Sequence, residues 1–129
     1  MTDALTDLLK MDDKGLIPAI AQQHDTGEVL MMAWMNLEAI KETLSTNRVC
    51  YWSRSRQALW RKGESSGHTQ TLVEFRLDCD GDTILLLVDQ VGVACHTGRR
   101  NCFYYTVSKD DIHINSEVEV SPDDMYGKK

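Results

Sequence analysis

Residues 73–88 read VEFRLDCDGDTILLLV and decide much of the predicted fold. In the first half of this stretch, apolar side chains alternate with charged ones, which is the period-two pattern of a half-buried strand. The apolar positions are Val73, Phe75, Leu77 and Cys79. Asp80-Gly81 is a strong signal for a tight turn, and residues 82–88 read as the returning strand. The stretch therefore predicts an antiparallel β-hairpin whose turn carries carboxylates and a thiol.

A second hairpin is predicted nearer the N-terminus. Residues 16–21 read as a strand, and the turn residues 25–28 separate them from residues 29–35, which are apolar on both faces, as in a buried strand. Because proline has no amide N–H for the ladder, Pro18 favours an edge position for the first of these strands.

One helix and two further strands complete the predicted elements. Asn36 is a good N-cap for a helix over residues 37–45, where apolar residues recur at helical spacing. This helix should cover one face of the sheet. Residues 49–52 and 102–107 are rich in β-formers and predict strands, whereas the pattern of residues 53–68 assigns no element.

Together the elements predict one compact α+β domain, built mainly of antiparallel strands with a covering helix. The expected domain covers residues 16–114. An N-terminal extension, residues 1–15, would precede it, and an acidic, mobile C-terminal tail, residues 115–129, would follow it. The length of 129 residues fits a single domain.

The composition is that of an ordinary globular protein with an acidic balance. The chain has 14 Lys+Arg against 20 Asp+Glu, a net charge of −6, and 42% apolar residues. This balance argues against a general nucleic-acid or anionic-membrane surface, which needs a basic excess. Since neither a membrane-length apolar run nor a leader pattern is present, a cytoplasmic location is expected. In that reducing compartment, cysteines serve as metal ligands, reactive thiols or core residues.

The turn of the first hairpin, residues 78–82, concentrates reactive groups. Along a strand, Asp78 and Asp80 would project to one side and Cys79 to the other. Carboxylates suit Mg²⁺, whereas a thiolate suits Zn²⁺. The alternative is a plain turn with solvated aspartates. A calcium loop is excluded because Thr83 stands where the EF-hand requires glycine, and a strand follows in place of a helix.

Cys95 and Cys102 occur in a second segment with candidate ligands, separated by six residues. That spacing is not the C-x₂-C pattern of structural zinc sites. Three cysteines with a nearby histidine fit a catalytic zinc, because three protein ligands leave the fourth position for water. For Cys79, Cys95 and Cys102 the alternative of a small core residue stays open. For Cys50, which lies in an apolar strand, the core interpretation is preferred.

Two histidines, His68 and His96, occur in glycine-containing loops, where general bases are often displayed. His96 directly follows a candidate metal ligand, so it would lie close to water bound at that metal. The alternative for each is a surface histidine without a chemical role.

Residues 52–62 hold a concentration of positive charge in this acidic chain, interleaved with serine and tryptophan. A solvated face is one interpretation. The other is a phosphate-binding surface in which arginine and lysine side chains donate to the phosphate while a tryptophan stacks on a base. The residues expected to contact such a ligand are Arg54, Arg56, Lys62 and Trp60.

Taken together, these motifs resemble one family, phosphoribosyl-AMP cyclohydrolase. The matching segments run in family order over most of the chain. They are residues 25–36 (DTGEVLMMAWMN), 51–56 (YWSRSR), 59–68 (LWRKGESSGH), 78–82 (DCDGD), 92–98 (GVACHTG) and 102–103 (CF). No single segment is sufficient for this resemblance, but the combination is highly specific.

The resemblance implies a homodimeric, metal-dependent enzyme of histidine biosynthesis. The implied Mg²⁺ ligands are Asp78, Asp80 and Asp82. The implied Zn²⁺ ligands, shared across the dimer interface, are Cys79, Cys95 and Cys102. Some relatives carry a second, pyrophosphohydrolase domain, for which this chain has no room, so a monofunctional enzyme is expected.

The implied reaction opens the adenine ring of 1-(5-phosphoribosyl)-AMP at the N1 to C6 bond and gives the phosphoribosyl-formimino carboxamide ribonucleotide. Zinc lowers the pKa of its water toward about 7 and so supplies hydroxide for attack on C6. Three thiolates make zinc a weaker Lewis acid than three histidines would, so a nearby base should help. We expect His96 to be that base, with His68 as the second candidate. Mg²⁺ would organise the substrate alongside the basic residues.

Two other classes of protein remain open from the residues alone. One is a zinc-stabilised binding module without catalysis. The other is a thiol-redox protein that oxidises Cys95 and Cys102 reversibly. Neither class requires the three aspartates beside Cys79.

Overall fold

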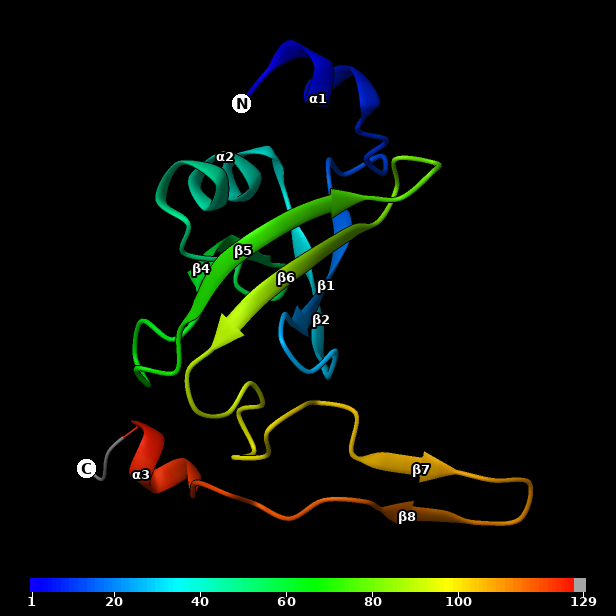
Figure 1. Ribbon diagram of the computed structural model, residues 1–129, viewed down its shortest axis with the longest axis vertical. Coiled ribbons are helices and arrows are strands. Elements are labelled where there is room, and N and C mark those ends of the chain that lie inside the picture. The colour runs from blue at the N-terminus through cyan, green and yellow to red at the C-terminus, as the bar shows by residue number, and fades with distance from the viewer. Residues whose placement is uncertain (127–129) are drawn as a thin grey trace.

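The computed structural model describes residues 1–126 of the chain. Six strands form one curled sheet in the order β4-β3-β2-β1-β6-β5 (Figure 1). The strands are β1 (Ile17–Gln23), β2 (Val29–Met35), β3 (Cys50–Ser53), β4 (Ala58–Arg61), β5 (Gln70–Leu77) and β6 (Ile84–Gln90). The other elements are α1 (Asp3–Leu8), α2 (Leu37–Thr46), β7 (Tyr105–Val107), β8 (Ile112–Ile114) and α3 (Pro122–Tyr126). This architecture confirms the prediction of a compact α+β domain with a mainly stranded core.

The strand that contains Pro18 is central, so its predicted edge position was wrong. β1 lies between β2, with which it forms the predicted antiparallel hairpin, and β6, with which it runs parallel. Pairing with β6 begins at Ala19↔Ile84, one residue beyond Pro18. The absence of an N–H group at Pro18 therefore removes no hydrogen bond between β1 and β6. The other pairings in the sheet are antiparallel.

Helix α2 covers one face of the sheet, as predicted. The Asn36 side chain accepts a hydrogen bond from the backbone N–H of Ala39 (2.9 Å), so it caps the helix at the expected residue. At the other end, Asn47 adopts the left-handed conformation (φ 61°) that ends many helices. Ile40 and Thr43, two residues of this helix, are fully buried.

The hairpin predicted over residues 73–88 is β5 and β6, paired from Gln70↔Gln90 to Leu77↔Ile84. The predicted alternation was wrong at Val73 and at Cys79, which are both exposed. A bulge between Leu72 and Glu74 changes the register, and Val73 is 55% exposed. Such a bulge adds a residue to one strand and shifts the side chain out of the alternation.

The C-terminal quarter of the chain departs most from the prediction. Strand β7 begins three residues later than the predicted start at Cys102, and it pairs only with β8 in a separate two-stranded arm (Figure 1). Farther on, the N–H groups of Glu119 and Val120 both donate to the carbonyl of Gly98 (2.8 and 3.1 Å). Met125 of α3 is buried. The predicted mobile tail thus makes defined contacts as far as residue 126, and its last residues, 127–129, lie outside the described residues.

The two faces of the sheet differ in burial. Along β1 and β6, buried residues alternate with half-buried ones. The buried set packs with α2 to form the core. The other face presents half-buried or exposed apolar residues, which include Ile20, Met32, Trp34, Leu85 and Leu87. Within residues 1–126, no helix has the length and apolar character that a membrane crossing requires.

Candidate functional site

The loop that follows β6, residues 92–102, is called the thiol loop because it carries Cys95 and Cys102. It folds back on itself: the N–H of Ala94 donates to the carbonyl of Arg100 (2.9 Å), and the N–H of Cys95 to that of Arg99 (3.2 Å). The N–H of Cys102 then donates to the carbonyl of Leu30 in β2 (2.8 Å). This path brings two of the three predicted zinc ligands together.

Arg100 ties the thiol loop to the sheet. Its guanidinium donates to the Glu28 carboxylate (3.2 Å), to the Gln23 side chain (3.1 Å) and to the carbonyl of Gln90 (3.3 Å). The neighbouring Asn101 donates to the second carboxylate oxygen of Glu28 (2.8 Å). Because these partners are far apart in the sequence, the position of the loop depends on the assembled sheet.

A buried polar chain continues from these contacts into the core. The Tyr51 hydroxyl donates to Gln70 (2.7 Å), and Gln70 donates to Gln90 (2.9 Å). Gln90 in turn donates to the carbonyls of His68 (3.1 Å) and Val91 (2.8 Å). Burial raises the pKa of Tyr51 well above its usual value, so the phenol stays protonated. A fully satisfied buried network of this kind fixes one arrangement of the surrounding loops.

The thiols of this loop lie in a largely buried environment. Burial, helped by the nearby Cys95 sulfur and opposed by Lys62, raises the pKa of Cys102 to about 12. The Thr97 hydroxyl donates to the Cys95 sulfur (3.1 Å). Lys62 donates to the carbonyl of Ala94. Burial lowers the pKa of this lysine, while Cys102 and Cys95 raise it. Cys95 and Cys102 therefore both lie near the ammonium group of Lys62.

His68 and His96, the two predicted bases, both lie at the thiol loop. Nδ1 of His68 accepts a hydrogen bond from the N–H of Val93 (3.2 Å), so the neutral ring carries its proton on Nε2. A Cβ at Gly92 would lie 2.8 Å from that nitrogen, which explains why glycine packs against the ring. His96 is exposed and directly follows the buried Cys95.

The turn between β5 and β6, residues 78–82, is called the acidic turn. The Asp78 carboxylate accepts hydrogen bonds from the N–H groups of Asp82 (3.0 Å) and Thr83 (3.2 Å). Slight burial raises the pKa of Asp78, but these backbone donors lower it below its usual value overall. The pKa of Asp82 is raised through its hydrogen bond with Asp78. Cys79 is exposed and its thiol donates to Asp80 (3.7 Å).

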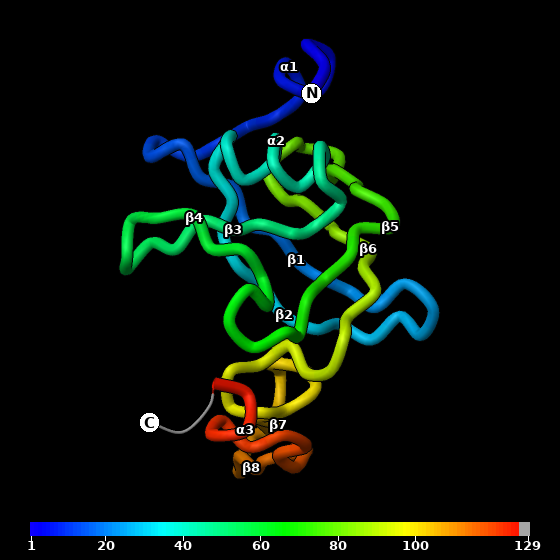
Figure 2. Tube along the Cα trace, turned by 90° about the vertical axis from the view of Figure 1, so that its left-hand side faces the viewer, coloured from blue at the N-terminus to red at the C-terminus, as the bar shows by residue number. Residues whose placement is uncertain are grey.

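The acidic turn and the thiol loop lie at opposite ends of the sheet. The turn lies near the chain that follows α1, and the loop lies at the far end beside α3 (Figures 1 and 2). Within residues 1–126 of a single chain, no three His, Cys, Asp or Glu side chains form a group that could hold a metal ion. A single chain thus brings Cys95 and Cys102 together and leaves Cys79 apart from them.

Three of the four predicted substrate-binding residues line one cavity of about 260 Å³. These residues are Arg56, Trp60 and Lys62. Serines 65 and 66 contribute hydroxyl groups, and Gly63, Glu64 and, from α3, Tyr126 complete the lining. Because Lys62 also contacts the thiol loop, this cavity and the two thiols are neighbours.

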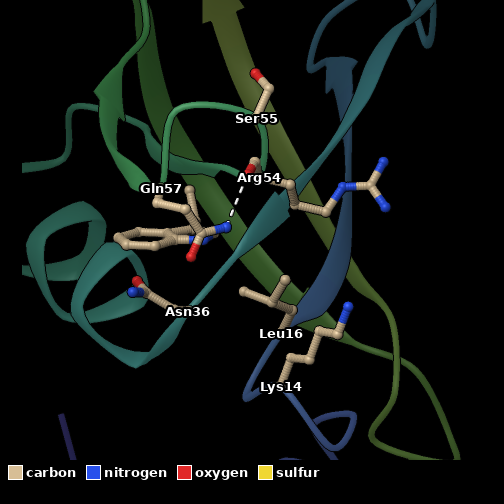
Figure 3. Close-up of a pocket in the computed structure, with 7 residues that line it drawn as sticks. Lys14, Leu16, Asn36, Arg54, Ser55 and Gln57 are labelled. Atoms are coloured by element: carbon tan, nitrogen blue, oxygen red, sulfur yellow. Dashed lines mark hydrogen bonds between the residues drawn. The ribbon is translucent and has the colours of Figure 1, made fainter.

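The fourth residue, Arg54, lines a larger cavity of about 670 Å³ with Lys14 and Trp52. The basic ends of Lys14 and Arg54 lie on the same side of this cavity, with Asn36 and Gln57 on the other (Figure 3). The Arg54 guanidinium lies 4.7 Å from the centre of the Trp34 ring. The structure therefore divides the predicted basic surface between two cavities.

The residues that hold the site in place were not predicted from the sequence. No sequence pattern singled out Arg100, and Glu28 was predicted only as one of the turn residues 25–28. Their pairing joins residues 72 positions apart and has no local signature. Lys14 and Tyr126 fall in segments interpreted as an extension and a tail. Cys50 is fully buried, as the core interpretation predicted, and burial raises the pKa of its thiol to about 12.

The fold and the paired thiols define the chain as an α+β protein with a candidate thiolate site at one end of a curled sheet. Comparison with known proteins identifies its family. The family model for phosphoribosyl-AMP cyclohydrolase matches residues 31–104, and the chain belongs to this family.

Relatives that bear the name phosphoribosyl-AMP cyclohydrolase match along nearly the whole chain. One from Rhodospirillum centenum is 66% identical over 98% of this chain and 95% of its own length. One from Chromohalobacter salexigens is 62% identical over 99% of this chain and 88% of its own length. One from Acidiphilium cryptum is 68% identical over 87% of this chain and 97% of its own length. The chain is therefore an enzyme of a hydrolase family.

Proposed function

We propose that the chain catalyses the hydrolytic opening of the adenine ring of 1-(5-phosphoribosyl)-AMP at the N1 to C6 bond, the third step of histidine biosynthesis. The observation that carries this proposal is the 66% identity over 98% of the chain to a relative named for that substrate. The product is the phosphoribosyl-formimino carboxamide ribonucleotide. A cytoplasmic location remains a prediction from the sequence.

In the proposed site, zinc is held by Cys95 and Cys102 of one chain and by Cys79 of a second chain. Two thiols that share one half-buried lysine are a suitable part of such a set, and the exposed Cys79 is accessible to another molecule. When bound, zinc would supply the hydroxide for attack on C6. Mg²⁺ is assigned to Asp78, Asp80 and Asp82 on the chemistry of their carboxylate oxygens, which suit a hard cation, although within residues 1–126 of the single chain the three side chains do not form a metal-holding group.

The proposal includes a homodimer, because the ligands on one chain are incomplete. Two apolar surfaces support this assembly. The open face of the sheet presents residues such as Trp34 and Met32, the latter 42% exposed. The β7–β8 arm exposes Val107 (71%) and Ile112 (61%). Exposed apolar surface of this extent is typical of interfaces between subunits.

Proton transfer in this scheme is assigned to the two histidines. His96 is exposed beside Cys95, and we assign to it the removal of a proton from the attacking oxygen and the delivery of a proton to N1 as the N1–C6 bond breaks. His68 is the second candidate. With Nδ1 occupied by the Val93 N–H, its neutral ring presents Nε2–H, which can donate but cannot accept. His96 is therefore the better base, and His68 is better suited to donate a hydrogen bond.

The substrate's phosphates are assigned to the basic cavity residues. Arg56 and Lys62, with Ser65 and Ser66, line the cavity next to the thiol loop, and Trp60 offers an aromatic wall. Arg54 would bind through the neighbouring cavity. Local cations of this kind can bind a doubly phosphorylated nucleotide although the whole chain is acidic.

The test of the proposal is turnover of phosphoribosyl-AMP combined with subunit complementation. We expect Cys79→Ser and Cys95→Ser each to lose zinc and turnover. When the two variants are unfolded, mixed and refolded, random pairing makes half of the dimers mixed. Each mixed dimer has one intact site, so about a quarter of the wild-type activity should return. Wild-type protein and each variant alone, taken through the same refolding, are the controls.

Mixed dimers without recovered activity, verified by native mass spectrometry, would contradict the shared site. Full activity in metal-free Cys95→Ser protein would contradict the zinc chemistry. An inactive wild-type protein, folded and loaded with both metals, would contradict the proposed substrate.

A further inference from the structure

Lys62 is a cation without a carboxylate partner. It follows β4 directly, its ammonium group donates to the carbonyl of Ala94, and it lies 5.3 Å from the centre of the Trp60 ring. Its side chain is half-buried. In the part of the chain from Met1 to Tyr126, no Asp or Glu oxygen lies within salt-bridge distance of its Nζ atom.

The neighbouring residue, Arg61, makes the contrast clear. Arg61 is exposed and donates two hydrogen bonds to Glu42, both 2.8 Å long. Arg61, which water could solvate, is thus paired with a carboxylate. Within residues 1–126, the more buried Lys62 has no carboxylate partner. Removing a charge from water is costly unless an opposite charge approaches it, and burial accordingly lowers the pKa of Lys62.

The anion that fits this position lies at Cys95 and Cys102. Both sulfurs are close enough to favour the charged form of Lys62. Three thiolates around one Zn²⁺ carry a net charge of −1, which a single ammonium group neutralises. We propose that Lys62 is the counter-charge of a zinc–thiolate centre at Cys95 and Cys102 and that it thereby retains the metal. This inference rests on the proposed function.

Two other roles for Lys62 are distinguishable from this one. Its hydrogen bond to Ala94 could position the thiol loop without any contribution from charge. Because it also lines the cavity with Arg56, it could instead bind a substrate phosphate. The first role depends on a donor at this position, and the second affects substrate affinity but leaves zinc affinity unchanged.

The test is zinc retention in the full-length protein, measured by competition with a chromophoric chelator at fixed pH. Lys62→Gln keeps a donor and removes the charge, whereas Lys62→Arg keeps both. We expect Lys62→Gln to bind zinc at least tenfold more weakly, the range found for partners of metal ligands, and Lys62→Arg to stay close to wild type. Arg61→Gln, which removes the adjacent exposed charge, is the matched control and should leave zinc affinity unchanged.

Wild-type zinc affinity in Lys62→Gln would overturn the proposal, and a raised KM with that same affinity would assign Lys62 to the substrate. Thermal melting of the metal-free variants verifies folding. If Lys62→Gln does not fold, Lys62→Met, which keeps an unbranched side chain and removes the charge, replaces it with the same expected loss. Failure of the proposed function can be distinguished from failure of the Lys62 proposal. It would appear as absent zinc binding or absent turnover in the wild-type protein.

Discussion

The acidic turn and the thiol loop both carry predicted zinc ligands, but they are ordered by different means. The carboxylate of the turn is held by neighbouring residues: Asp78 accepts from the N–H groups of Asp82 and Thr83, no more than five residues away, while the N–H of Lys10 adds a bond to the carbonyl of Gly81 (2.7 Å). The thiol loop is held by distant partners, because Arg100 bonds to Glu28 and Gln23. Ligands of one proposed site can therefore differ in how far their geometry depends on the rest of the fold.

This difference has a consequence for mutations. A change at an aspartate of the acidic turn should alter metal binding and leave the fold intact, since these carboxylates are exposed and the hydrogen bonds of Asp78 are local. A change among the partners of the thiol loop should affect stability, the cavity beside Lys62 and the two thiols together, because these groups share one network.

The largest effect is expected for Arg100→Ala. It removes hydrogen bonds to Glu28, Gln23 and the carbonyl of Gln90. Hydrogen bonds from a charged group contribute strongly, so we expect a loss of about 2 kcal/mol in the free energy of unfolding, measured by urea denaturation. Hydrogen exchange should increase over the thiol loop. Asp78→Ala is the matched change in the acidic turn and should cost markedly less, with faster exchange confined to the turn. Equal losses of unfolding free energy for Arg100→Ala and Asp78→Ala would contradict the proposed difference between the thiol loop and the acidic turn.

A smaller effect, about 1 to 2 kcal/mol, is expected for Gly98→Ala and Gly81→Ala. In each region, a glycine packs against a terminal segment of the chain. A Cβ at Gly98 (φ +90°) would lie 1.8 Å from the carbonyl oxygen of Val120, and one at Gly81 (φ +73°) would lie 2.1 Å from that of Leu8. Alanine must therefore displace the C-terminal segment in the first variant and the N-terminal segment in the second.

The two glycine variants should differ in the consequences of that displacement. Loss of the C-terminal segment should loosen the thiol loop and open the cavity that Tyr126 lines. Loss of the N-terminal segment should leave the acidic turn ordered, because Asp78 holds it from within. Hydrogen exchange resolved by peptide distinguishes the two outcomes, and protection lost in the acidic turn of Gly81→Ala would contradict its independence.

The elements that the sequence predicted correctly are those with local causes. The hairpin at Asp80-Gly81 and the helix capped by Asn36 are encoded by neighbouring residues, and both were predicted. The same reasoning failed at Pro18, because its position in the sheet depends on the pairing of β1 with β6, which begins at Ile84, and not on the residues beside it. It also extended the last strand back to Cys102, whose N–H instead donates to Leu30.

The candidate site follows the same division. The residue types and spacing made Cys79, Cys95 and Cys102 candidate ligands, but no pattern could indicate that one chain separates the first from the other two. Nor could spacing reveal that Lys62 faces the thiols while Arg61, one residue earlier, faces Glu42. Those facts depend on the direction of β4 and on the return of the chain after β6.

The smallest effect concerns pH, where the two regions should respond at opposite ends of the scale. Backbone donors hold the pKa of Asp78 below the usual 3.8, so its stabilisation of the turn is present above that pH and is lost as the pH falls through the lowered pKa. Burial raises the pKa of Cys102 from 9.0 to about 12, so the protonated thiol stabilises the metal-free loop below pH 9, and this contribution is lost as the pH rises toward 12.

Amide resonances in metal-free protein provide the measurement for this contrast. The Thr83 amide, which donates to Asp78, should shift only on the acid side, and the Cys102 amide only on the alkaline side. Asp78→Asn should remove the first transition and Cys102→Ser the second, each leaving the other unchanged. If one substitution moved both transitions, the turn and the loop of a single chain would be coupled through the sheet. Their separate titration would instead mean that the turn and the loop of a single chain are energetically independent.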